Sequence, residues 1–479
     1  MTTRPDRMWF GKRGTSLGGS QKTTVGFPLS NAILDHLELS AAPLAAVLGA
    51  ELQAPLIDGT TARYVNLDYA ASTPALQQVN DYVQGVLPYY ASVHRGAGYA
   101  SQISTSLYEN ARTTVRTFVG GREDDAVIFT RNTTDALNLL AGCLPEDGEV
   151  LYLDLEHHAN LLPWLRRPHR GIVACDTIEA TLAAVEEELS SGTISLLAVT
   201  GASNVTGEVL PVARLAAAAH AHGARIAVDA AQLAPHRRIN LVRDGIDYVA
   251  FSGHKLYAPF GAGALVGRTD WLDAGVPHLA GGGAVKAVKV DSVVWTTGPA
   301  RHEGGSPNVL GAAALAHATE VIAGLDGEDW LRHESDLRQA LVAGLSHLPG
   351  ITVHRIFSDS ADAIGVVNFS VHGYDAGLVA AYLSAEHGVG LRDGKFCAHP
   401  LLKRLGLPSG SLRASFGLGS RQDDVDRLLT GLTSLLRDGL GADYVVDTGR
   451  WVPAVETRAF PDWAPHTPGT AGAAPCTTD

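Results

Sequence analysis

Four reactive side chains lie at the ends of two apolar segments that neighbour each other along the chain. The first segment ends in Asp229, and the second runs directly into Ser252, His254 and Lys255. If both segments are strands of an open α/β sheet, their carboxyl ends meet at the edge where ligands bind. A lysine amine condenses with an aldehyde, and a carboxylate keeps a pyridine nitrogen protonated, so that the ring can accept electrons from a substrate carbanion. The pattern predicts a site for pyridoxal 5'-phosphate (PLP), with Lys255 holding the cofactor as a Schiff base.

Each of these residues has an ordinary structural explanation when it is taken alone. Lys255 by itself would be a solvated loop lysine, and Asp229 could cap a helix. The context favours the cofactor site, because Lys255 follows an apolar strand and precedes the turn-forming residues 259–263. Gln232, three residues after Asp229, falls at the same predicted edge.

Hydroxyl side chains follow another predicted strand. Residues 130–135 read Thr-Arg-Asn-Thr-Thr-Asp, which places Thr133 and Thr134 at the start of a predicted helix. Free N–H groups and the helix dipole favour an anion at such a position. This pattern indicates a phosphate site, and an ordinary helix cap is the alternative.

Two adjacent histidines, His157 and His158, follow the next predicted strand. A neutral imidazole at this place could lie on the face of a cofactor ring. Zinc binding is the alternative, but adjacent side chains diverge and no third ligand is suitably spaced. Stacking or core packing is therefore favoured, and no metal is expected.

A parallel sheet is needed to position these side chains. Residues 64–270 show the pattern expected of one, in which short apolar runs alternate with helical segments. Helical patterns such as 134–141 and 212–222 fill the gaps between short apolar runs. This βαβ rhythm is typical of a sheet that helices cover on both faces. The predicted strands are 126–130, 149–155, 194–200, 225–229, 248–251 and 262–266.

The remainder of the chain predicts further parts. Two long helical stretches, 308–325 and 330–348, precede a strand and helix alternation to about 440 that is typical of a smaller α/β domain. The apolar spacing over 31–52 predicts an amphipathic helix, and the Pro-, Thr- and Ala-rich end of the chain predicts partial disorder. We expect a mobile arm (1–30), an N-terminal segment that packs on the small domain or on a partner (31–63), a PLP-binding large domain (64–325), a small C-terminal domain (326–440) and a tail (441–479).

Composition excludes several classes of protein. The 479 residues are 46% hydrophobic and carry a formal net charge of −13, so nucleic acid is not an expected partner. No apolar run is long enough to span a bilayer and none forms a secretory signal, so we expect a cytoplasmic protein that binds no membrane. The four cysteines lack a C-x-x-C pair, which argues against a disulfide framework or a zinc knuckle. They are Cys143, Cys175, Cys397 and Cys476.

Taken together, the motifs resemble those of the class V aminotransferase family, and within it the cysteine desulfurase and selenocysteine lyase branch. The resemblance runs from about residue 64 to 440. It implies the aspartate aminotransferase-like PLP fold (fold type I), with a large, mostly parallel sheet and a smaller C-terminal α/β domain. The matching segments are LDYAASTP (67–74), VHRG (93–96), TRNTT (130–134), EHHAN (156–160), SNVTG (203–207), VDAAQ (228–232), FSGHK (251–255), EGGSPN (303–308) and RDGKFCA (392–398).

The same resemblance implies roles for individual residues. Asp229 would face the pyridine nitrogen, His157 would stack on the ring, and Ser306 would reach the phosphate from a second subunit of a homodimer. The implied cofactor-binding residues are Thr133, Thr134, His157, Asp229, Gln232, Ser252, His254, Lys255 and Ser306.

Substrate recognition and catalysis are implied in the same way. Arg413 would fork onto the substrate carboxylate. The implied catalytic residues are Lys255, Cys397 and His157, and the implied substrate-binding residues are His94, Asn204, Arg392 and Arg413.

The resemblance also implies a mechanism in which Lys255 removes the Cα proton of a substrate aldimine, after which two routes are open. In a desulfurase, Cys397 attacks the substrate sulfur and alanine is released, and a sulfur acceptor protein would be a possible partner. In a β-lyase the sulfur departs by elimination and no thiol is needed. Lys395 and Phe396 stand where the family carries two histidines, and Lys395 could lower the Cys397 pKa by its charge. This departure keeps an aminotransferase, an epimerase or a decarboxylating deaminase of a specialised pathway as the alternative function.

Overall fold

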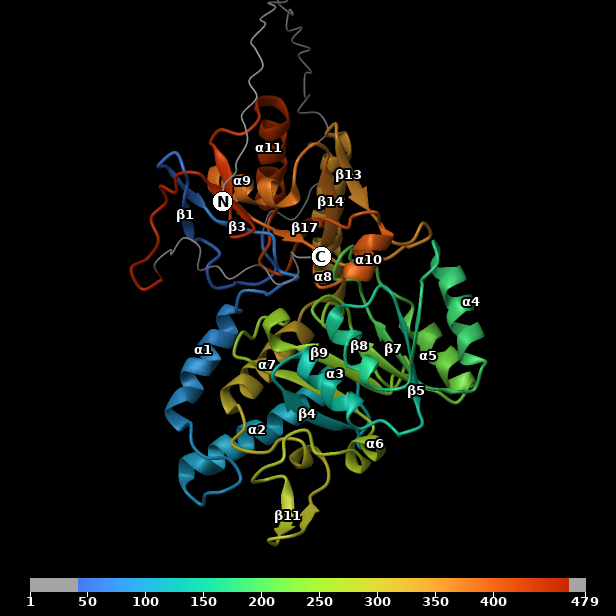
Figure 1. The fold of residues 1–479 in the computed structure, drawn as a ribbon. Coiled ribbons are helices and arrows are strands. Elements are labelled where there is room, and N and C mark those ends of the chain that lie inside the picture. The colour runs from blue at the N-terminus through green and yellow to red at the C-terminus, as the bar shows by residue number, and fades with distance from the viewer. Residues whose placement is uncertain (1–41, 465–479) are drawn as a thin grey trace, which may run out of the picture. The chain divides into compact units, whose positions relative to one another are not determined.

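A computed structural model of the chain describes residues 42–464 (Figure 1). The arm expected at 1–30, the first part of the segment 31–63 and the end of the tail lie outside these residues.

A seven-stranded sheet forms the centre of the larger part of the fold (Figure 1). Its order is β4-β10-β9-β8-β7-β5-β6, and β10 runs antiparallel to both of its neighbours while the strands from β9 to β6 are parallel. The six predicted strands are all present, within two residues of their predicted ends, and the mostly parallel sheet is confirmed. The strands are β4 (Ala126–Thr130), β5 (Glu149–Leu153), β6 (His169–Ile172), β7 (Ile194–Thr200), β8 (Arg225–Asp229), β9 (Tyr248–Ser252) and β10 (Gly263–Gly267).

Alternate residues of these strands enter two different apolar clusters. In β8, Ile226 and Val228 pack into one cluster, and Ala227 packs into the other. Helix α3 (Thr133–Ala141) contributes to the cluster on one face, whereas α4 (Ile178–Leu189), α5 (Val212–Ala221) and α7 (Val309–Ala323) contribute to the other. Both faces are therefore buried, as the continuous apolar strands predicted. The helices α1 (Gln77–Val86), α2 (Tyr99–Phe118) and α6 (Thr269–Ala274) and the hairpin β11 (Val285–Val288) and β12 (Val293–Trp295) complete this part.

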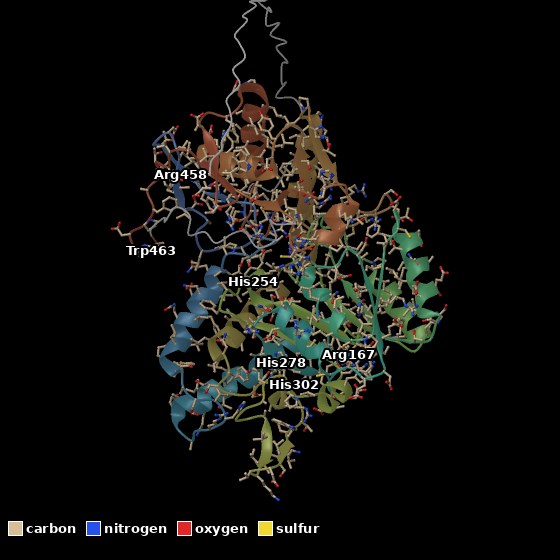
Figure 2. All side chains as sticks on the ribbon, viewed as in Figure 1. Arg167, His254, His278, His302, Arg458 and Trp463 are labelled. Atoms are coloured by element: carbon tan, nitrogen blue, oxygen red, sulfur yellow. The ribbon has the colours of Figure 1, made fainter. Side chains whose placement is uncertain are left out.

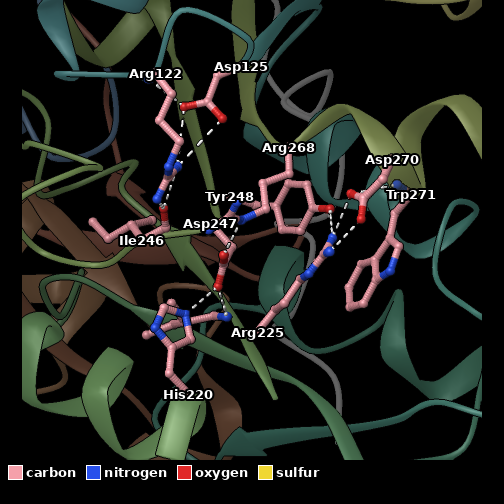
Figure 3. Close-up of polar contacts among 11 residues, drawn as sticks. Arg122, Asp125, His220, Arg225, Ile246, Asp247, Tyr248, Arg268, Asp270 and Trp271 are labelled. Atoms are coloured by element: carbon pink, nitrogen blue, oxygen red, sulfur yellow. Dashed lines mark hydrogen bonds and ion pairs between the residues drawn. The ribbon is translucent and has the colours of Figure 1, made fainter. Parts of the chain in front are cut away.

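Ion pairs bind together the amino-terminal edge of this sheet (Figure 3). Asp247, just before β9, accepts hydrogen bonds from His220 Nε2 at 2.8 Å, Arg268 Nε at 2.6 Å and the Ile226 backbone N–H at 3.0 Å. Arg225 donates to the Tyr248 hydroxyl at 2.8 Å. The charges at this edge are paired with one another, which leaves the carboxyl edge for ligand chemistry.

A smaller antiparallel sheet, of order β13-β14-β17-β16, follows in the chain. Three helices pack on it around a separate apolar cluster that includes Leu341, Leu383 and Leu428. The elements are α8 (Gly327–His347), β13 (Ile351–His354), β14 (Val366–Val371), α9 (Ala376–His387), β15 (Val389–Gly390), β16 (Arg392–Gly394), α10 (His399–Arg404), β17 (Ser411–Ser415) and α11 (Gln422–Asp438). No single helix in the described ranges is long and apolar enough to cross a membrane; only the bent pair α7 and α8 together has that length and composition.

The helix predicted over 31–52 is wrong for the described residues 42–52. They form turns, and the Leu44 and Ala45 backbone N–H groups donate to the Leu418 carbonyl at 2.8 and 3.2 Å. Pro43 and these long-range contacts replace the helical hydrogen bonds. The chain then forms a hairpin of β1 (Gln53–Pro55) and β2 (Thr61–Arg63), followed by β3 (Val65–Asn66), which pairs with β15.

The tail contains a hairpin that the sequence analysis missed. Strands β18 (Tyr444–Asp447) and β19 (Arg450–Pro453) are joined by Thr448 and Gly449, which have φ values of 46° and 81°. Two positive φ angles in a two-residue loop match the turn that joins tightly twisted strands. The Tyr444 hydroxyl donates to Glu386 Oε1 at 2.8 Å, which attaches the hairpin to α9.

Candidate active site

The carboxyl ends of β4, β7, β8 and β9 border a cavity of about 210 Å³. Asp229 ends β8, and Lys255 lies in the short 3-10 helix η5 (Gly253–Lys255) that follows β9. Side chains from the smaller sheet close the other side of this cavity. The predicted site residues that line it are Thr133, Thr134, His157, Asn204, Asp229, Gln232, Ser252, His254 (labelled in Figure 2), Lys255, Arg392, Cys397 and Arg413.

The half-buried Lys255 side chain lies at the wall of this cavity. Burial lowers the pKa of Lys255 to about 8, and the positive charge of Arg413 acts in the same direction. The carboxylates of Asp229 and Asp68 oppose that shift. An amine with this pKa is partly neutral near pH 8, so it can act as a nucleophile or as a base.

Asp229 supplies a buried carboxylate beside that amine. Only 3% of the residue is exposed, and Oδ1 accepts a hydrogen bond from the Ala231 backbone N–H at 2.9 Å. Burial raises the pKa of Asp229, while the nearby Lys255 charge lowers it. A protonated ring nitrogen beside Asp229 would stabilise its ionised form. Gln232 Nε2 donates to the Ala70 carbonyl at 2.7 Å, which fixes the amide at the rim of the site.

A cluster of hydroxyl groups lies at the N-terminus of α3. The Ser252 hydroxyl is 2.7 Å from that of Thr133 and accepts the Thr133 backbone N–H at 2.8 Å. Burial lowers the pKa of His254 to about 4, so its imidazole is neutral. The Nδ1 atom of His254 lies 3.2 Å from the Ser72 hydroxyl. Hydroxyls, an imidazole and a helix N-terminus form a donor set suited to a phosphate.

His157 is the first of the two adjacent histidines and the only one of the pair that lines this cavity. Its Nδ1 accepts the Ala159 backbone N–H at 3.0 Å, so in the neutral ring the proton is on Nε2. Burial lowers the pKa of His157 to about 3, with further contributions from the charges of Lys255 and His158. His158 packs instead against His399, with ring centroids 4.6 Å apart. The two imidazole rings therefore lie in different surroundings and do not converge on one metal ion.

Arg413, on β17, is the buried cation of the site. Its Nη1 donates to the Asn204 carbonyl and its Nη2 to Asp68 Oδ1, both at 2.8 Å, while Nε is buried without a protein partner. Each Nη nitrogen carries a second N–H, and because Arg413 lines the cavity, its guanidinium can donate to a carboxylate there. No role of Asp68 could be predicted from local pattern, because it lies 345 positions from Arg413 in the chain.

Cys397 lies in a loop with an unusual backbone. Phe396 and Cys397 have φ values of 54° and 53°, in the left-handed region that side chains other than glycine rarely adopt. The loop is held by Asn204 Nδ2, which donates to the Phe396 carbonyl at 2.8 Å, and by the His158 N–H, which donates to the Cys397 carbonyl at 2.8 Å. Such strain is typical of functional loops. The loop places the Phe396 ring beneath Arg413, whose guanidinium lies 5.1 Å from the ring centroid.

Two predicted site residues do not line this cavity. His94 is exposed, and its Nε2 lies 3.0 Å from Glu109 Oε1 on α2. Ser306 is exposed in the loop before α7. Within one chain, neither residue is brought to Lys255.

The structure also adds residues that sequence reasoning missed. Thr200 lines the cavity at the end of β7. It could have been predicted, because ligands bind at the carboxyl ends of the strands in open α/β sheets. Glu156 is fully buried nearby, where Oε2 accepts Asn160 Nδ2 at 2.6 Å, and burial raises the pKa of this carboxyl well above its usual range.

Comparison with known proteins gives consistent matches. The family described as Aminotransferase class-V matches residues 65–428. A probable cysteine desulfurase of Halalkalibacterium halodurans is 33% identical over 390 residues, which cover 77% of this chain and 92% of that protein. A cysteine desulfurase of Dickeya dadantii is 35% identical over 361 residues, covering 73% of this chain and 86% of that protein.

Solved structures agree with these matches. The cysteine desulfurase CsdA of Escherichia coli, in an S-sulfonic acid form, has a TM-score of 0.69 and 32% identity, covering 78% of this chain and 95% of that chain. The apo structure of a cysteine desulfurase from Thermococcus onnurineus has a TM-score of 0.73 and 31% identity with the same coverage.

Proposed function

Because this chain belongs to the class V aminotransferase family, we propose that it is a PLP-dependent cysteine desulfurase, which takes sulfur from L-cysteine and releases alanine. One observation carries the proposal: the Lys255 amine and the Cys397 thiol line a single cavity together with the Arg413 guanidinium. A β-lyase would need the first of these groups and not the second.

The residues of the cavity fit PLP. The amine of Lys255 would hold the aldehyde carbon, and the buried Asp229 would face the pyridine nitrogen. Thr133, Ser252 and His254 would bind the phosphate at the N-terminus of α3, where their donors are already gathered. When it is bound, PLP supplies an electron sink for the electron pair left on Cα.

The chain's own groups would perform the remaining steps. Arg413 and Asn204, which both line the cavity, would orient the substrate carboxylate. Lys255 Nζ would take the Cα proton, because its lowered pKa leaves part of it neutral. His157, which carries its proton on Nε2, would lie on the ring face.

Cys397 would then receive the sulfur. Its thiolate would attack the substrate sulfur, so that an S–S bond forms as the C–S bond breaks, and protonation of the carbon gives alanine. The sulfur must leave Cys397 before the next turnover, and an acceptor protein or another thiol would take it.

The proposal includes a homodimer. Exposed apolar side chains on and beside the β11–β12 hairpin support it, with Val288 65%, Val290 108% and Val294 56% exposed. Ser306 is exposed as well, and in a dimer it would reach the site of the partner.

Products formed from L-cysteine by the holoenzyme test this function. We expect alanine from the wild type and a loss of at least about a hundredfold in Cys397→Ala, because no other thiol lines the cavity in the described part of the chain. Cys175→Ala, which changes a partly buried thiol elsewhere, should leave alanine formation unchanged. Pyruvate formation that survives Cys397→Ala would indicate β-elimination instead. No product from any sulfur amino acid would refute C–S bond cleavage and favour a transaminase, epimerase or deaminase.

A further inference from the structure

A second cavity, of about 770 Å³, lies on the outer side of the Cys397 loop. It shares Arg392, Phe396 and Cys397 with the cavity that contains Lys255. The loop is therefore a wall common to both spaces, and Cys397 lines each of them. The outer cavity is more than three times as large as the inner one, and it falls within the range of small-molecule sites.

The far wall of this outer cavity is the β18–β19 hairpin, through Val446, Arg450 and Trp451. These residues lie beyond residue 428, where the family match ends. Trp451 packs tightly on the N-terminus of α9, since a Cβ atom at Gly377 would lie 3.2 Å from its Cδ1. The wall is thus part of the folded structure and is an addition to the matched family region.

The charges in the outer cavity favour an anion. Arg392, Lys395 and Arg450 line it, and none of them makes a side-chain hydrogen bond or ion pair within residues 42–464. Of the two carboxylates, Asp375 is engaged as the N-cap of α9, where it accepts the Gly377 backbone N–H at 2.8 Å. Asp393 faces Arg392 and Arg450, and burial raises its pKa. Two opposing carboxylates against three cations leave one net positive charge for a ligand.

We propose that the outer cavity binds the sulfur acceptor, a low-molecular-weight thiol that carries carboxylates. This inference rests on the proposed function, since it requires a persulfide on Cys397. The acceptor thiolate attacks the terminal sulfur of Cys397–S–SH, the S–S bond to Cys397 breaks, and the products are the acceptor persulfide and the Cys397 thiolate. Sulfur enters the loop from the inner cavity and leaves it from the outer cavity, with no other oxidant or reductant.

The holoenzyme and L-cysteine test this proposal with two acceptors, mercaptosuccinate and uncharged thioglycerol, compared at equal thiolate concentration. Alanine formation over many turnovers should be half-saturated at about a tenfold lower concentration of mercaptosuccinate. Arg450→Gln should raise that concentration about three- to tenfold, which is the loss expected for one partly exposed charged contact. It should leave the thioglycerol rate and the single-turnover yield of alanine unchanged.

Arg437→Gln is the matched control, because this exposed arginine on α11 pairs with Asp438 outside the cavity. If both thiols half-saturate alanine formation at the same concentration and Arg450→Gln has no effect, the acceptor site is refuted. Alanine formed in a single turnover would still support desulfuration in that case. Turnover that stops after one equivalent of alanine with every small thiol would also overturn it and favour an acceptor protein. Absence of the first equivalent would refute the proposed function, and the acceptor site with it.

Discussion

Substitution of Arg413 by lysine should impair recognition of the substrate carboxylate without removing the positive charge. Nη1 and Nη2 donate to the Asn204 carbonyl and to Asp68 Oδ1, both at 2.8 Å, which leaves one further N–H on each Nη for a substrate. A lysine ammonium presents its three donors tetrahedrally from one atom, so it cannot reproduce the planar spread by which the guanidinium reaches Asn204, Asp68 and a substrate in different directions. Loss of at least one hydrogen bond to a charged group costs about 1.5–3 kcal/mol, which lowers kcat/KM by about 10- to 150-fold.

Steady-state alanine formation from L-cysteine measures this effect. We expect kcat/KM to fall by about 10- to 150-fold, mainly through KM, because the carboxylate is held in the ground state as well as in the transition state. Arg237→Lys is the matched control: it changes another part-buried arginine, paired with Glu334 and Asp362, that does not line the site. A fall of less than about threefold in Arg413→Lys, with full cofactor occupancy, would refute the assignment.

Two further outcomes follow from the charges of the fold. The rate at which the apoprotein captures added PLP should rise with pH and level off near pH 8. The reason is that burial lowers the pKa of Lys255 to about 8. A rate that keeps rising toward pH 10, as for an ordinary lysine, would contradict this prediction. Asp247→Ala should lower the free energy of unfolding by about 3 kcal/mol in urea titrations at neutral pH, since it leaves His220, Arg268 and the Ile226 N–H without their acceptor. Burial alone would raise the pKa of Asp247, but these hydrogen bonds lower it, so the stabilisation is present above the unfolded pKa of about 3.9 and is lost as pH falls through the folded value. An unfolding difference that is the same at neutral and strongly acidic pH would contradict the ion-pair account.

The strands that carry the site could be predicted from local pattern. Short, continuous apolar runs end at Thr130, Thr200, Asp229 and Ser252, and the sheet places those ends on one edge. The rule needs only the strand direction, which the βαβ alternation provides. The predicted helix over 31–52 failed in its described part because its apolar residues contact distant segments such as Leu418.

The segment that follows the matched region shows a further limit of local pattern. The β18–β19 hairpin lies in a tail whose end has a composition typical of disorder, and Glu386, on a different element, attaches it to α9. No local signal reports such an attachment, since it depends on how α9 is placed. Ser306 illustrates the same limit, because the position predicted for it requires a second subunit.

The type of chemistry could be predicted from the residues and their order alone: an amine and a carboxylate at strand ends, hydroxyls at a helix start and a thiol in a later loop. These follow from residue type and short-range order. Three arrangements required the folded structure: Asp68 and Asn204 hold Arg413, Cys397 borders two cavities, and the tail encloses the outer one. Each of these contacts joins segments far apart in the chain, so packing of the folded elements, rather than local propensity, sets the distances between them.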